Sequence, residues 1–88
     1  MAVREGFVRC EVRKGVFARE YEVAVPSTAG PLHRAIVDQD DIMRRAGQSA
    51  VRVRLLSCEP DRCLVDLPQE TLANGRRVWV PRAALVEE

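Results

Sequence analysis

The sequence predicts an all-β domain, a small barrel built from two similar three-stranded halves. One observation is that apolar and polar residues alternate in several stretches, with the period of two that a half-buried strand requires. Another is that the apolar pattern of residues 7–43 returns in residues 50–86. A repeat of this kind dictates the architecture of a chain. The two halves are therefore expected to share one core.

The repeat depends on a few identities and on the matching apolar pattern. The identical pairs are Val8/Val51, Arg9/Arg52, Arg34/Arg77 and Val37/Val80, 43 residues apart, and Val23/Val65 and Pro26/Pro68, 42 residues apart. The alternative is that two ordinary strand patterns resemble each other by chance. A half of this length buries too little apolar surface to fold alone. Residues 1–88 are therefore predicted to form a single domain.

The composition is that of a globular protein, with 47% hydrophobic and 31% charged residues and a net charge of +1. So small a charge produces no field that would attract nucleic acid or a membrane surface. The sequence has no apolar run near the ~20 residues that span a bilayer, and its first residues lack the apolar core of a signal peptide. We therefore expect a cytoplasmic protein with no membrane partner.

The first predicted strand covers residues 7–13 and turns Val8, Cys10 and Val12 to one face. Lys14-Gly15 follows, which suits a two-residue hairpin because glycine accepts a positive φ.

The return strand is predicted over Val16–Val25 and ends at Pro26, which lacks a backbone donor. Its expected inward face carries Phe17, Tyr21, Val23 and Val25. Arg19 interrupts this pattern, so either a bulge lies there or the charged head reaches past the end of the barrel. The second half has one residue fewer in this region, which favours the bulge.

The second half repeats the design with strands over Val51–Leu56 and from Cys63 to a stop at Pro68, joined by a turn at residues 59–62. Asn74-Gly75 is a turn signal before a strand over Arg76–Val80. The residues expected to face the core are Val51, Val53, Leu55, Cys63, Val65 and Leu67.

One-turn helices are predicted near residues 38–42 and 81–85, because Asp or Pro directly after a strand suits the first positions of a helical turn. Each leads to a short final strand. In the first half a longer helix from Asp38 to Gly47 is the alternative. This arrangement resembles small SH3-like or related barrels, in which a one-turn helix precedes the last strand, and the resemblance implies an architecture without implying a function.

The three cysteines are predicted to be reduced thiols, because their number is odd and no export signal is visible. Cys58 and Cys63 flank a four-residue turn, so a disulfide between them is the alternative. Adding Cys10 and His33 makes a poor zinc site, since the spacing fails the usual patterns. No metal or other cofactor is expected.

The other candidate chemical residues have structural explanations. His33 has no adjacent carboxylate or nucleophile, so we interpret it as a surface residue. Asp38, Asp40 and Asp41 fail the spacing of a calcium loop and are explained by capping or solvation. Without a catalytic cluster or a glycine-rich phosphate loop, an enzyme is not expected.

The most suggestive residues are Arg77 and Trp79, which alternation places on the outer face of their strand. Arg52 and Arg54 point outward in the same way, so the four side chains could share one surface. Arg and Trp are frequent in binding hot spots. The alternative places Trp79 in the core, covered by a loop of the chain itself.

We therefore predict a non-catalytic binding module that recognises a protein, which could be a second copy of itself. The rival function is RNA or single-stranded DNA binding, through bases stacked on the aromatic ring and phosphates bound by arginine. A small-molecule site would need an interior larger than side chains can fill, which an 88-residue barrel does not provide.

Overall fold

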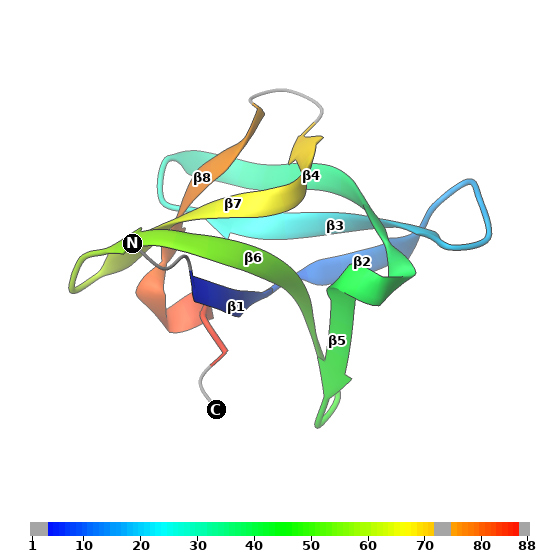
Figure 1. The fold of residues 1–88 in the computed structure, drawn as a ribbon, viewed down its shortest axis with the longest axis horizontal. Coiled ribbons are helices and arrows are strands. Elements are labelled where there is room, and N and C mark those ends of the chain that lie inside the picture. The colour runs from blue at the N-terminus through cyan, green and yellow to red at the C-terminus, as the bar shows by residue number, and fades with distance from the viewer. Residues whose placement is uncertain (1–3, 72–74, 87–88) are drawn as a thin grey trace.

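The computed structural model describes residues 4–71 and 75–86, and most of them lie in β-strands (Figure 1). In chain order the elements are β1 (Arg4–Arg9), β2 (Glu11–Lys14), β3 (Glu20–Ser27), β4 (Gly30–Asp38), η1 (Gln39–Asp41), β5 (Ile42–Arg45), β6 (Gln48–Cys58), β7 (Arg62–Thr71), β8 (Gly75–Pro81) and η2 (Arg82–Ala84). The predicted all-β class is confirmed.

All strand pairs are antiparallel, in the order β1-β6-β7-β4-β3-β2, with β5 also on β6 and β8 also on β7. The strands divide into two sheets, β2-β3-β4 on one side and β1, β5, β6, β7 and β8 on the other, so β1 and β5 of the first half join the strands of the second. The sheets meet where Ala35 of β4 pairs with Thr71 of β7. The path begins at β1 and ends at β2, and these two strands are consecutive in the chain, separated by Cys10.

The first strands of the two halves pair with each other around Val8 and Val51, both 0% exposed. Each of these valines also receives the end of the other half. Ile42 of β5 pairs with Val51, and Leu85 forms an isolated bridge to Val8. Four segments from the beginning, the middle and the end of the chain therefore meet at two adjacent residues.

The core consists of the inward residues of both sheets, and most are valines. β-branched side chains suit this position because they pack well on a pleated surface. The fully or nearly fully buried members are Val8, Val23, Val25, Ala35, Val37, Val51, Val53, Cys63, Val65, Leu67, Val78 and Val80. The inward faces predicted for the strands of the second half are confirmed.

Both one-turn helices are present as single 3-10 turns. Asp38 caps the first, because its carboxylate accepts a hydrogen bond from the backbone N–H of Asp40 at 2.8 Å. The longer helix to Gly47 does not form. The chain instead enters β5 at Ile42 and turns at Ala46 and Gly47, which adopt φ of 53° and 78°.

The hairpin between β2 and β3 differs from the prediction. Its loop covers residues 15–19 and projects from the body of the molecule (Figure 1). Gly15 donates its N–H to the Glu20 carbonyl at 2.8 Å, and a Cβ at Gly15 would lie 2.7 Å from that oxygen. Glycine is thus required here by close approach of the backbone. Phe17, predicted to face the core, is 69% exposed, and Arg19 belongs to the loop instead of a bulge.

Three strand boundaries also differ. The predicted strand over residues 7–13 breaks at Cys10, because there the chain changes its pairing partner from β6 to β3. Pro26 and Pro68 do not end their strands, which continue to Ser27 and Thr71. In both cases the register shifts around the proline, so that the missing N–H falls at an irregular position of the ladder.

We predict that Phe17→Ala changes the free energy of unfolding by less than about 0.5 kcal/mol, because the ring contributes little to the core. Val23→Ala, which removes two buried methyl groups, should cost about 2 kcal/mol. Urea denaturation of the two variants measures both. A large loss for Phe17→Ala would mean that this ring packs inside, as the alternation of residues suggested.

Candidate functional site

Three of the charged residues on the outer surface form a row across β6, β7 and β8. Arg54 lies opposite Asp66 on the neighbouring strand, and Asp66 lies opposite Arg77. These positions alternate with the buried residues Val53, Val65 and Val78, so all three carry their side chains on the outer face. The row confirms that Arg54 and Arg77 lie on the same outer face.

Asp66 holds Arg77 through two hydrogen bonds. The Arg77 Nε donates to Oδ1 at 3.0 Å, and Nη2 donates to Oδ2 at 3.4 Å. This contact raises the pKa of the Arg77 guanidinium above its ordinary value, through the hydrogen bond first and the charge of Asp66 second. Arg54 makes no hydrogen bond or ion pair in the described part of the chain, so its cation is available to a ligand.

Trp79 is half-buried, which neither of the two alternatives foresaw. It pairs with Leu64 on β7, and the Arg62 guanidinium lies over its ring, 4.0 Å from the centroid. Arg62 is held there because its Nε donates to the Glu59 carboxylate at 2.8 Å. The indole is therefore covered by a cation, in a stack of the kind that guanidinium groups favour.

Arg52 lies at the end of this outer surface opposite to Trp79. It follows the outward face of β6, lies opposite Phe7 of β1, and donates to the Asp40 carbonyl at 3.3 Å. Because β6 and β8 run in the same direction, Arg52 and Trp79 diverge from the central row toward opposite ends. The outer surface defined by Arg52, Arg54, Arg77 and Trp79, here called the Arg–Trp face, is thus an elongated strip.

A shallow groove of about 230 Å³ lies beside the central row. Its charged lining residues are Arg52, Arg54 and Arg76 together with Glu5, Asp41 and Asp66. Cations and anions are thus interleaved along it. Each charge repels ligands of its own sign, so the groove favours a surface that carries both signs.

Arg76 was not among the predicted site residues. Its Nε donates to the Leu67 carbonyl at 3.1 Å and its Nη2 to the Pro68 carbonyl at 3.3 Å. Strict alternation would turn Arg76 away from Arg77. It lines the groove where the β7–β8 register shifts between Asp66 and Thr71, around Pro68.

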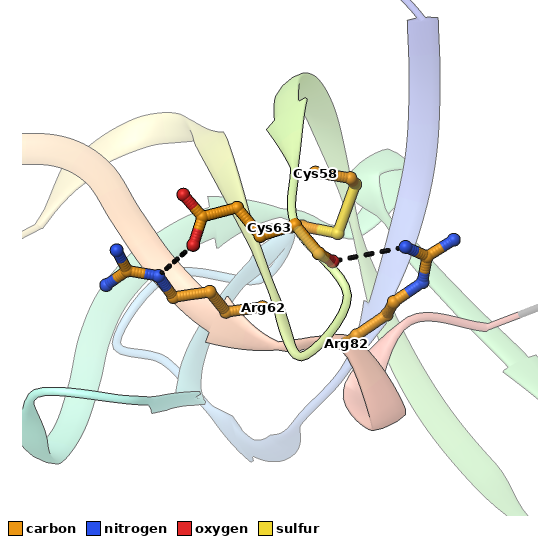
Figure 2. The surroundings of a disulfide bond; sticks show 5 residues. Cys58, Arg62, Cys63 and Arg82 are labelled. Carbon is orange, nitrogen blue, oxygen red and sulfur yellow. Dashed lines mark hydrogen bonds and ion pairs between the residues drawn. A yellow bond between two sulfur atoms is a disulfide. The ribbon is translucent and has the colours of Figure 1, made fainter.

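The thiol prediction is wrong for two of the three cysteines. A disulfide joins Cys58 and Cys63, which are register partners at the end of the β6–β7 hairpin with their Cα atoms 4.1 Å apart (Figure 2). The tight turn between them brings the side chains together. Cys10 is a free thiol, and burial raises its pKa to about 11.

The turn carrying this disulfide is also held by polar contacts. Arg82 donates its Nη1 to the Glu59 carbonyl at 3.1 Å and its backbone N–H to the Asp61 carbonyl at 3.0 Å. Figure 2 shows Arg62 and Arg82 on opposite sides of the disulfide. The turn between β6 and β7 thus links the core, which Cys63 joins, with Arg62, which covers the Trp79 ring.

His33 is partly buried instead of lying on the surface, and its Nδ1 has no hydrogen-bond partner in the described ranges. Of the acidic cluster, Asp38 and Asp40 form ion pairs with Arg19 at 3.3 and 2.9 Å. The Asp40 N–H and then Arg19 lower the pKa of Asp38. Within residues 4–71 and 75–86, no group of side chains is suited to hold a metal ion.

Comparison with protein-family models, curated proteins and solved structures finds no match to this chain. Among the residues that the structure describes, no helix has the length and apolar character needed to cross a membrane.

We predict that Trp79→Ala lowers the free energy of unfolding by about 2 kcal/mol, less than the 3–5 kcal/mol typical of a fully buried Trp. Arg62→Ala should cost about 0.5–1 kcal/mol, through loss of the stacked cation. Leu56→Ala, an exposed apolar residue on β6, serves as a control that changes little. Thermal melts compare the three. A Trp79 variant that does not fold would place the indole in the core.

We also predict that the variant Cys58→Ser/Cys63→Ala folds but loses about 2 kcal/mol of stability, the entropy expected from opening a loop this short. Adding a reductant should lower the stability of the wild-type protein toward that of the variant and leave the variant unchanged. Equal stability of wild type and variant under oxidising conditions would show that the bridge contributes nothing.

Proposed function

We propose that this chain is a non-catalytic binding module that recognises a protein partner through the Arg–Trp face. The observation that carries the proposal is the interleaving of cations and anions along the groove lined by Arg54 and Asp66. A partner protein can match such a pattern charge for charge, which sets specificity and orientation. Arg and Trp residues would supply the strongest contacts.

Nucleic acid is the less favoured ligand, for two reasons. Asp66 already occupies one edge of the Arg77 guanidinium through two hydrogen bonds, and Glu5 and Asp41 line the groove beside it. These carboxylates would repel a phosphate backbone, whose binding depends on uncompensated cations. The stacked Arg62 would also have to leave the ring of Trp79 before a base could take its place.

The proposal includes the architecture, a small SH3-like or related barrel made of two repeated halves. The ordering of strands supports closure, because the ladder begins and ends on the consecutive strands β1 and β2. Corresponding register pairs support the repeat: Val12–Val23 with Leu55–Val65, Tyr21–Val37 with Cys63–Val80, and Ile42–Val51 with Leu85–Val8. A closed barrel would keep the Arg–Trp face rigid.

The location that we propose is the cytoplasm, as the composition suggested. A disulfide persists most readily in oxidising compartments. In a reducing one, the bridge between Cys58 and Cys63 would be open to attack by cellular thiols.

The first test uses the protein alone. We expect it to self-associate with rising concentration in sedimentation experiments, and Arg54→Glu to weaken that association about tenfold, because it reverses one charge of the central row. The Arg54 guanidinium makes no hydrogen bond or ion pair in the described part of the chain, so the substitution breaks no contact and should cost only about 0.5 kcal/mol, through repulsion from Glu5 and Asp66 on the neighbouring strands. Arg45→Glu, also exposed but on β5, is the matched control.

A second measurement separates the rival function. Titration with an oligothymidylate at low and moderate salt should show no binding. Tight binding that weakens steeply as salt rises would favour nucleic acid. Association that responds to Arg45→Glu and not to Arg54→Glu would place the interface on a different face.

A further inference from the structure

The two sulfur atoms of the disulfide lie in different surroundings. Cys58 is an exposed residue at the end of β6, whereas Cys63 is 0% exposed within the core. Exchange of a disulfide requires that a thiolate reach one of its sulfurs. An incoming thiol can therefore approach the Cys58 side and not the Cys63 side.

Cys58 also lies in the wall of a groove of about 600 Å³. This groove runs between the start of β1, the end of β6 and the segment after η2. Its apolar walls come from Phe7, Leu55, Leu85 and Val86. A space of this size accommodates a small molecule, and its position places that molecule against the accessible sulfur.

The charged groups of the groove favour an anion. Arg4 and Arg82 line it, with Glu5 as the acidic member of the lining. Glu5 has Arg54 as its cross-strand neighbour, which offsets part of its charge. Arg82 uses Nη1 for the Glu59 carbonyl, and Arg4 makes no hydrogen bond or ion pair within the described ranges. Guanidinium groups with free donors bind carboxylates well.

We propose that this groove is a thiol–disulfide exchange site, in which a small thiol carrying carboxylates is held by Arg4 and Arg82 and reacts at Cys58. The inference concerns a different surface from the Arg–Trp face and does not depend on the function proposed for it.

The exchange is balanced in two steps. The thiolate of the small molecule attacks the Cys58 Sγ, a new sulfur–sulfur bond forms, and the Cys58–Cys63 bond breaks with its electron pair on the Cys63 Sγ, which takes up a proton. A second thiolate then attacks the outer sulfur of the mixed disulfide. This second attack releases Cys58, which takes up a proton, and forms a disulfide between the two small molecules. Two small thiols are thereby oxidised and one protein disulfide is reduced.

Opening the disulfide should change the surroundings of Trp79, the only tryptophan of the chain. Cys63 is fixed by its packing, so separation of the two sulfurs must move Cys58. Glu59 follows Cys58 in the chain and holds Arg62 over the indole. Its displacement would loosen that cover, and the fluorescence of Trp79 would report it.

The test compares three thiols on the folded protein: glutathione, which is anionic, 2-mercaptoethanol, which is neutral, and cysteamine, which is cationic. After acid quenching, mass spectrometry of peptides locates and counts the mixed disulfide. Rates are expressed per thiolate and divided by the rate of the same thiol with a small-molecule disulfide, because the nucleophilicity of a thiolate itself varies with its thiol pKa. We expect the adduct on Cys58, formed on the order of fivefold faster with glutathione than with cysteamine. A change in Trp79 fluorescence should accompany it.

Variants identify the cause of the preference. Arg82→Gln should abolish the advantage of glutathione without slowing 2-mercaptoethanol, and Arg45→Gln, an exposed arginine outside the groove, should change neither rate. If Arg82→Gln does not fold, Arg4→Gln and a salt series on the wild-type protein decide, because salt should also remove the preference. Equal rates for the three thiols, an adduct on Cys63 or Cys10, or reaction only after unfolding would overturn the proposal.

Discussion

The packing of Val8 against Val51 is the contact on which the rest of the structure depends. These residues join the first strands of the two halves, and both are completely buried. Each also receives the end of the other half, Val51 from Ile42 and Val8 from Leu85. Because the two halves and the ends of both are attached here, loss of this pair would separate elements that no local interaction could hold together.

The turn between β6 and β7 plays a comparable role on the surface. Its residues are held by the disulfide, by Arg82 and by the ion pair of Glu59 with Arg62. Through Arg62 the turn covers Trp79, and through Cys58 it borders the groove lined by Arg4 and Arg82. The Cys58–Cys63 disulfide thus lies between two candidate binding surfaces, so its oxidation state can influence both.

The charges on the outer surface explain why a protein partner is favoured over nucleic acid. Antiparallel pairing places residues of neighbouring strands directly opposite each other, at distances where opposite charges attract. In this chain that pairing brings Asp66 between Arg54 and Arg77. The arginines that make the sequence look suited to phosphate are therefore partly neutralised by acids that are distant in sequence.

The sequence by itself determined most of the residues that face the core, Phe17 excepted, and where the single helical turns lie. Both depend on local relations, the alternation that buries Val65 and Leu67 and the cap that Asp38 makes with Asp40. It also placed Arg54 and Arg77 on the outer face correctly, by the same alternation.

Only the tertiary structure decided the features that depend on register and on distant partners. The loop that exposes Phe17 is set by the approach of Gly15 to Glu20 and by the ion pairs of Arg19 with two acids. These are Asp38, at the end of β4, and Asp40, in η1. The cover over Trp79 and the disulfide both require the pairing of β6, β7 and β8, because only that pairing brings residues of separate strands into contact.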